Sequence, residues 1–134
     1  MAVIPRSQLF PLLLEACPSY EAVWNTFLAE YADEPEPLSY VALAQFARHL
    51  SNVLAAGDQQ SLRRVFDLLE RLIIDGDADA QEATVVGIIK NLQNEHLHQN
   101  TKPDDYLPYL LPESERWWGK VRGFWINGRL LSED

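Results

Sequence analysis

Apolar residues recur every three or four positions along almost the whole chain, and this period constrains the fold more than any other feature. One face of an α-helix repeats with this spacing, whereas a half-buried strand alternates with a period of two. The single strand-like run, residues 85–89, is flanked by residues that favour helix. We therefore predict an all-α protein in which residues 1–134 form one compact domain of about six or seven helices.

Helix-breaking and helix-capping residues divide this pattern into segments. The predicted helices run from Pro5 to the residue before Pro18, from Ser19 as N-cap to a break at residues 33–37, from Leu38 or Ser39 to Ala56, from Asp58 to Gly76, from Asp77 or Asp79 to Asn94, from about Pro103 to Leu110, and from Pro112 to about Trp125. The second helix has a broad apolar face made by Ala22, Val23, Phe27 and Leu28 with Trp24 and Tyr31. The fifth has a nearly continuous apolar run and is expected to be the most buried.

Two Gly-Asp pairs, Gly57-Asp58 and Gly76-Asp77, mark very short turns between successive helices. Helices joined by such short turns pack antiparallel. The recurrence of the pair is also typical of helical repeats, in which each hairpin buries its face on the next. The expected architecture is therefore an antiparallel helical bundle or a short HEAT-like helical stack.

The chain carries a net charge of -9, which excludes several classes of partner. Nucleic-acid binding requires Lys and Arg to neutralise phosphates, and anionic membranes also attract basic proteins. A negative protein instead steers a basic protein toward itself. Residues 12–14 are too short an apolar run to span a bilayer, and no secretion signal precedes them. We expect a soluble cytoplasmic protein that binds another protein, with no nucleic-acid or membrane partner.

The sequence contains no recognisable catalytic or metal-binding motif, so we expect no cofactor and no metal. Cys17 is the only cysteine and is expected to be a small buried apolar residue. The acidic residues 75–79 resemble the start of a calcium loop, but Ala80 and Val86 stand where an EF-hand needs glycine and glutamate. His96 and His98 are two residues apart and are interpreted as polar loop residues.

Three acidic clusters are the candidate partner-binding residues. The first is Glu30, Asp33, Glu34 and Glu36; the second is Asp75, Asp77, Asp79 and Glu82; the third is Asp104, Asp105, Glu113 and Glu115. All three fall at helix starts or connections, where solvated capping carboxylates are common. If the helices zigzag, alternate connections meet at one end, and the clusters could merge into one negative surface.

The last predicted helix is unusually rich in tryptophan. Its spacing predicts that Trp117, Val121 and either Phe124 or Trp125 face the core, with Trp118 off that face. An exposed Trp118 would be a candidate anchor for a partner, because buried tryptophans often dominate the energy of an interface. Packing of Trp118 in the core is the alternative.

Four segments carry a resemblance to known proteins: Leu14-Glu15-Ala16-Cys17-Pro18, Phe46-Ala47-Arg48-His49-Leu50, Leu68-Leu69-Glu70-Arg71-Leu72 and Asn91-Leu92-Gln93-Asn94. Together they resemble a family of short, acidic, all-helical bacterial proteins of unknown function. In size, charge and class the chain also resembles immunity proteins, which neutralise toxins delivered by neighbouring bacteria. This second resemblance implies a toxin as the partner and implies no site residue.

We therefore predict a non-enzymatic protein-binding module, of the immunity or antitoxin type, whose acidic surface occludes a basic toxin domain. The predicted contacts are Asp33, Glu34, Glu36, Asp75, Asp77, Asp79, Glu82, Asp104, Asp105 and Trp118. One alternative is a helical-repeat scaffold or adaptor in an endogenous complex. Another is a small enzyme that uses carboxylates and residues 95–98.

Overall fold

The computed structural model describes residues 3–33 and 39–127, and these contain seven α-helices and no strand. The α-helices are α1 (Leu9–Ala16), α2 (Glu21–Glu30), α3 (Ser39–Ala55), α4 (Gln59–Asp75), α5 (Ala78–Glu82), α6 (Lys90–Leu92) and α7 (Pro112–Asn127). Single turns of 3-10 helix, η1 (Arg6–Gln8), η2 (Pro18–Tyr20) and η4 (Glu95–Leu97), and the longer 3-10 segment η5 (Pro103–Tyr109) connect them. The predicted all-α class is confirmed.

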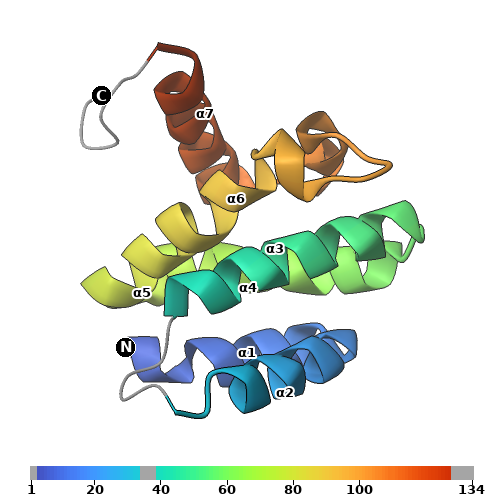
Figure 1. The fold of residues 1–134 in the computed structure, drawn as a ribbon. Helices are drawn as coiled ribbons and strands as arrows, with labels where there is room; N and C mark the ends of the chain where they lie inside the picture. The colour runs from blue at the N-terminus through green and yellow to red at the C-terminus, as the bar shows by residue number, and fades with distance from the viewer. Residues whose placement is uncertain (1–2, 34–38, 128–134) are drawn as a thin grey trace.

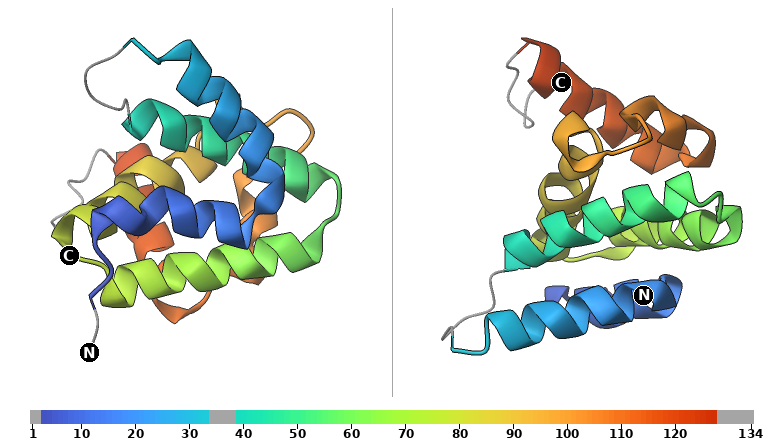
Figure 2. Two further views of the ribbon diagram at one scale, coloured as in Figure 1. Left: turned by 90° about the horizontal axis from the view of Figure 1, so that it is seen from below. Right: turned by 45° about the vertical axis from the view of Figure 1, so that its right-hand side comes forward.

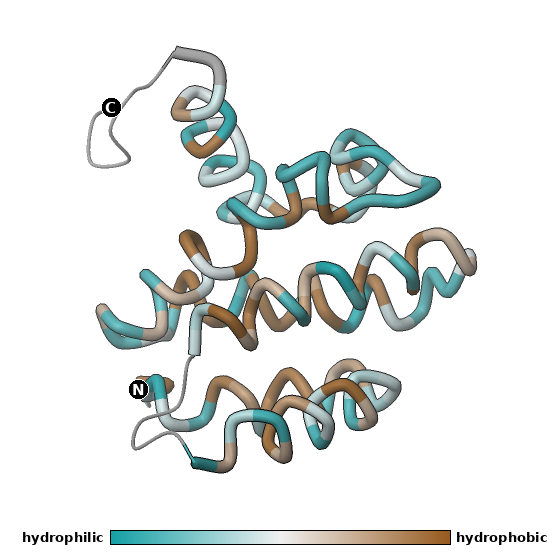
Figure 3. The backbone as a smooth tube through the Cα atoms, in the orientation of Figure 1, coloured by the Kyte–Doolittle hydropathy of each residue, from teal (hydrophilic) through white to brown (hydrophobic). Residues whose placement is uncertain are grey.

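The helices lie in three layers around one core (Figure 1). In the first layer α1 and α2 pack on α4 and α3, which form the middle layer. The third layer contains α6, η5 and α7, and α5 lies level with the middle layer, from which the chain rises to α6. Apolar stretches occur in all three layers (Figure 3). The first four helices thus form two stacked hairpins, as in a helical stack. The third layer does not repeat this hairpin, because η5 and α7 fold back over α4.

Both Gly-Asp turns form as the sequence predicts. Gly57 has a φ of +74°, a left-handed conformation that favours glycine, and Asp58 accepts a hydrogen bond from the Ser61 backbone N–H at 3.2 Å. After α4, the Asp77 carboxylate accepts from the Ala80 N–H at 2.7 Å and caps α5. Asp77, rather than Asp79, is therefore the N-cap.

The predicted fifth helix is continuous from α5 through a π-helical segment, η3 (Ala83–Ile89), into α6. All but one of the residues in this segment are buried, the exception being Val86. A π-helix widens the turn by one residue, and it begins here where η3 crosses α3. The prediction that this run is deeply buried is confirmed. The spacing of its apolar residues did not predict that it would be a π-helix.

The predicted N-cap at Ser19 is wrong. Ser19 lies inside η2, and Tyr20, which precedes α2, makes no side-chain cap. The Ser19 hydroxyl is instead 2.8 Å from Nε2 of His49 on α3. The first predicted helix also begins as 3-10 turn η1, after Pro5, before α1 starts at Leu9. Cys17 is fully buried, as predicted.

Within the described part of the chain, no helix combines the length and the apolar character needed to cross a membrane.

Candidate protein-binding surface

The carboxylates of Asp33, Asp79 and Glu82 are exposed at one end of the molecule, and we call these three residues the acidic end. Asp33 follows α2, whereas Asp79 and Glu82 belong to α5. Figure 2 shows the start of α3 between the end of α2 and α5 in both views. The structure therefore brings exposed members of the first and second acidic clusters to the same end. Glu34 and Glu36, also predicted contacts, lie outside the described residues.

Tyr40, in the first turn of α3, lies near charged residues of the second acidic cluster, and its pKa responds to them. The Arg6 guanidinium lies 5.5 Å above the Tyr40 ring. The pKa of Tyr40 is raised, first by burial and then by the nearby carboxylate of Glu82. The Arg6 guanidinium lowers this pKa, but by less than Glu82 raises it, and Asp79 adds a smaller increase. At Tyr40 the carboxylates of Glu82 and Asp79 therefore outweigh Arg6.

The other two residues of the second cluster have structural roles. Besides capping α5, Asp77 accepts a hydrogen bond from the Arg6 backbone N–H at 3.3 Å. The Asp77 N–H donates to the Ile4 carbonyl at 2.9 Å, and the Ile4 N–H donates to the Asp75 carbonyl at 2.8 Å. These bonds hold the N-terminal segment against the α4–α5 turn. Asp75 and Asp77 are both half-buried.

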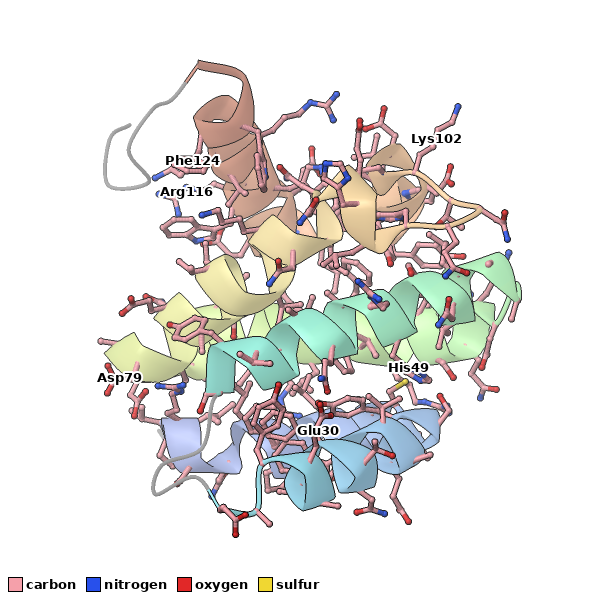
Figure 4. All side chains as sticks on the ribbon, in the orientation of Figure 1. Glu30, His49, Asp79, Lys102, Arg116 and Phe124 are labelled. Carbon is pink, nitrogen blue, oxygen red and sulfur yellow. The ribbon has the colours of Figure 1, made fainter. Side chains whose placement is uncertain are left out.

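Asp104 and Asp105 of the third acidic cluster lie on the opposite side of the molecule from Asp79. In Figure 4, Asp79 and Lys102, the residue before η5, are labelled at opposite sides. Asp104 forms an ion pair with Arg122 at 2.7 Å, and Asp105 accepts from the Lys102 backbone N–H at 2.9 Å. The expectation that all three clusters merge into one surface is therefore wrong. The reason is that η5 packs on α4 at Phe66, whose ring centre is 5.7 Å from that of Tyr106, and not at Asp75, where α4 ends before α5.

Trp118 is 3% exposed, so the prediction that it offers an exposed anchor is wrong. Its ring contacts the Tyr106 ring edge-on at 6.1 Å, and the Gln93 amide donates to the Trp118 carbonyl at 2.8 Å. Residues Ser114, Trp118 and Val121 form the buried face of α7. Trp117, predicted to face the core, is half-buried, and Lys120 lies 4.8 Å from its ring centre. Trp117 still packs against the core and Val121 is fully buried, as predicted, so the error concerns Trp118, which the edge-on ring of Tyr106 on η5 also draws into the core.

A groove of about 620 Å3 lies beside the acidic end, between η1, α1, α2 and the start of α3. We call it the aromatic groove; it is lined by Arg6, Ser7, Phe10, Pro11, Trp24, Phe27, Leu28, Tyr31, Ala32, Ser39 and Ala42. Its wall is a row of rings: Phe10 stacks on Trp24 with centres 4.4 Å apart, Trp24 on Phe27 at 5.6 Å, and Phe27 contacts Tyr31 at 4.9 Å. The sequence placed Trp24, Phe27 and Tyr31 on the broad apolar face of the second predicted helix and did not single out Phe10. The sequence feature that could have indicated a groove here is the width of the apolar face of α2, because this face is broader than one neighbouring helix covers.

The histidines near residue 98 stabilise a connection. His98 Nε2 is 2.8 Å from the Leu92 carbonyl, and Nδ1 is 2.7 Å from the Thr101 hydroxyl. Because a carbonyl only accepts, Nε2 carries the proton and Nδ1 accepts from Thr101. His96 is exposed. No group of three or more His, Cys, Asp or Glu side chains in the described residues has an arrangement that would hold a metal ion.

The fold and surface define a compact helical protein with a negative end next to an apolar groove. The chain belongs to the family described as "Domain of unknown function (DUF7674)", whose model matches residues 10–126. The match extends from α1 into α7 and includes α5 and every groove-lining residue except Arg6 and Ser7. The resemblance to an unknown-function family is therefore confirmed. No curated protein and no solved structure matches the chain significantly.

Proposed function

We propose that this protein is a protein-binding module of the immunity or antitoxin type, which occludes a basic toxin domain with its acidic end. The observation that carries the proposal is the exposure of Asp33, Asp79 and Glu82 at one end of a chain with a net charge of -9. Neither Asp79 nor Glu82 forms an ion pair with a described residue. Carboxylates without an internal cation are available to a cation of the partner.

The physical role of such a surface is mainly kinetic. Charge complementarity raises the association rate and excludes partners of like charge, and the gain falls as salt screens the charges. An inhibitor that must meet a toxin before the toxin meets its target benefits from a fast association rate. Exposed ion pairs add little affinity by themselves, typically below about 1 kcal/mol each. Tight occlusion therefore also requires apolar contacts.

The first test is affinity capture of the tagged protein from its native bacterium, with elution in a salt gradient. We expect one basic partner that is toxic when expressed alone and harmless when co-expressed with this protein. A constitutive, non-toxic partner would favour the alternative, a scaffold or adaptor in an endogenous complex. Recovery of no basic partner would contradict both the toxin proposal and the electrostatic argument.

The second test reverses charge at the acidic end. The double variant Asp79→Lys/Glu82→Lys should slow association with the captured partner and flatten its salt dependence. The matched control is Glu15→Lys/Asp67→Lys, which changes the net charge equally at two exposed positions on α1 and α4. If both variants associate with the partner at the same rate, net charge rather than the acidic end controls the encounter.

A further inference from the structure

We propose that the aromatic groove receives one amphipathic helix of the basic partner, whose apolar side chains fill the groove while its Lys and Arg side chains face the acidic end. This inference rests on the proposed function, since it requires that the chain bind a protein. It adds the place, the shape and the chemistry of the contact.

The groove follows the direction of α2. Three of its rings, Trp24, Phe27 and Tyr31, are spaced along α2 so that they fall on one side of the helix. A groove along a helix suits a second helix, which inserts anchors at positions i, i+3 or i+4, and i+7. Its volume of about 620 Å3 lies within the range of pockets that bury a ligand, about 300–1,000 Å3.

The apolar face of α2 is only partly covered by this chain. Phe27 is buried, but Leu28 is 48% exposed, and Trp24 and Tyr31 are half-buried. Covering apolar area contributes about 25 cal/mol per Å2, so a partner side chain seated here gains most of its binding energy from this strip. Aromatic side chains in such a position commonly act as hot spots.

The charges around the groove select the sign of the partner. Asp33 directly follows Ala32 in the groove wall, and Ser39 in that wall is adjacent to Tyr40, where the field of Glu82 exceeds that of Arg6. Arg6 is the only cation lining the groove, and its guanidinium is placed over the Tyr40 ring. No carboxylate lines the groove itself, so the negative charge lies beyond its rim, at Asp33 and on α5. A helix that fills the groove with apolar side chains and directs Lys or Arg toward this end therefore complements both surfaces.

A second groove on the other side of α2 is less suitable. It has a volume of about 490 Å3, and its lining mixes the apolar Val23, Val41, Ala44 and Leu97 with polar residues and with the charged Glu30 and Arg48. Its charges of both signs select no partner, and no row of ring contacts extends along it in the described residues. We therefore place the basic amphipathic helix in the aromatic groove, where an apolar wall lies next to the acidic end.

The test uses the full-length protein and three synthetic helical peptides of equal length. One has a Leu face and a Lys face, one a Leu face and a Glu face, and one has Ser in place of Leu with the Lys face kept. Binding is measured by fluorescence anisotropy, and the site by amide and indole NMR shifts. We expect the Leu/Lys peptide to bind most tightly and to shift the Trp24 indole and the Leu28 and Asp33 amides.

Two variants with nearly equal exposure test the site. Leu28 and Leu107 are 48% and 46% exposed, but Leu107 lies on η5, outside the groove. Leu28→Gln should weaken the Leu/Lys peptide about tenfold, whereas Leu107→Gln should leave its affinity unchanged. Equal affinity in both variants, equal binding of the Leu/Glu or Ser/Lys peptide, or NMR shifts confined to other surfaces would overturn the inference.

The captured partner separates this inference from the proposed function. If Leu28→Gln retains the partner with wild-type affinity, the groove is not its binding site, although protein binding itself stands. If the wild-type protein captures no partner and the Leu/Lys peptide does not bind, both proposals fail. Loss of the partner in Leu28→Gln but not in Leu107→Gln would support both.

Discussion

Gly87 in η3 lies so close to Leu43 on α3 that a Cβ at position 87 would be 2.4 Å from the Leu43 Cδ1 atom. The Leu43 Cβ and Cγ atoms would also be within 3.3 Å of it. Both residues are fully or almost fully buried, so neither side has free space to yield. This contact sets the separation between α3 in the middle layer and η3. Because η3 is continuous with α5, the contact also positions the exposed Asp79 and Glu82 of α5.

Gly87→Ala should destabilise the protein by about 1–3 kcal/mol, because an added methyl group in a close-packed crossing forces its neighbours apart. Urea unfolding measures this change. The matched control is Gly119→Ala in α7, where an added Cβ meets nothing within 4 Å. There alanine should stabilise the helix by up to about 1 kcal/mol. Gly87→Ala made in a Leu43→Ala background should lose most of its cost, and an unchanged cost would contradict the proposed clash.

Glu70→Ala should destabilise the protein by roughly 1.5–3 kcal/mol, the usual contribution of hydrogen bonds to a charged group. The Glu70 carboxylate on α4 accepts from the Glu113 and Ser114 backbone N–H groups, both at 2.8 Å, and so caps α7 from another helix. The exposed Asp67, one turn earlier on α4, provides the control. Asp67→Ala should change stability by less than about 0.5 kcal/mol. Similar effects of the two substitutions on the unfolding midpoint would show that the cap contributes little.

Acidification through the His49 transition should reduce stability. Burial lowers the pKa of His49 below its usual value of 6.5, so the unfolded chain binds the proton more tightly than the folded chain. The contribution of His49 is therefore complete above about pH 6.5 and is lost as the pH falls toward the lower, folded-state pKa. An NMR titration of the imidazole should give a midpoint below 6.5. In His49→Gln, the slope of stability against pH should become smaller between pH 7 and 5, and an unchanged slope would contradict this assignment.

The Nε2 atom of His98 should carry a proton, because that atom faces the Leu92 carbonyl. Nitrogen-15 chemical shifts of the imidazole distinguish the two tautomers directly. Thr101→Val removes the hydroxyl that donates to Nδ1 and should loosen the 98–101 connection, seen as faster amide exchange there. A proton on Nδ1 would require a different orientation of the ring.

The sequence predicted which residues of the candidate surface are exposed, but not which of them lie together in the folded protein. The exposed carboxylates of Asp33, Asp79 and Glu82 are where their helix-start and connection positions predicted. Their separation from Asp104 and Asp105 depends on which end of α4 receives η5, a long-range choice that local residues do not encode. Trp118 was misassigned for the same reason, since both sides of α7 carry apolar residues and only the position of Tyr106 selects one.

The sequence by itself determined the helices and most of their ends. Periodic apolar residues, Gly57, Gly76 and the capping carboxylates of Asp58 and Asp77 act within one turn of the backbone, so their effects are local and readable. Only the tertiary structure decided what each apolar face meets. In the folded protein Phe27 is buried, Trp118 packs on Tyr106, and Leu28 remains exposed in the aromatic groove. These outcomes depend on contacts between residues far apart in the chain, whose energies arise only when the layers pack.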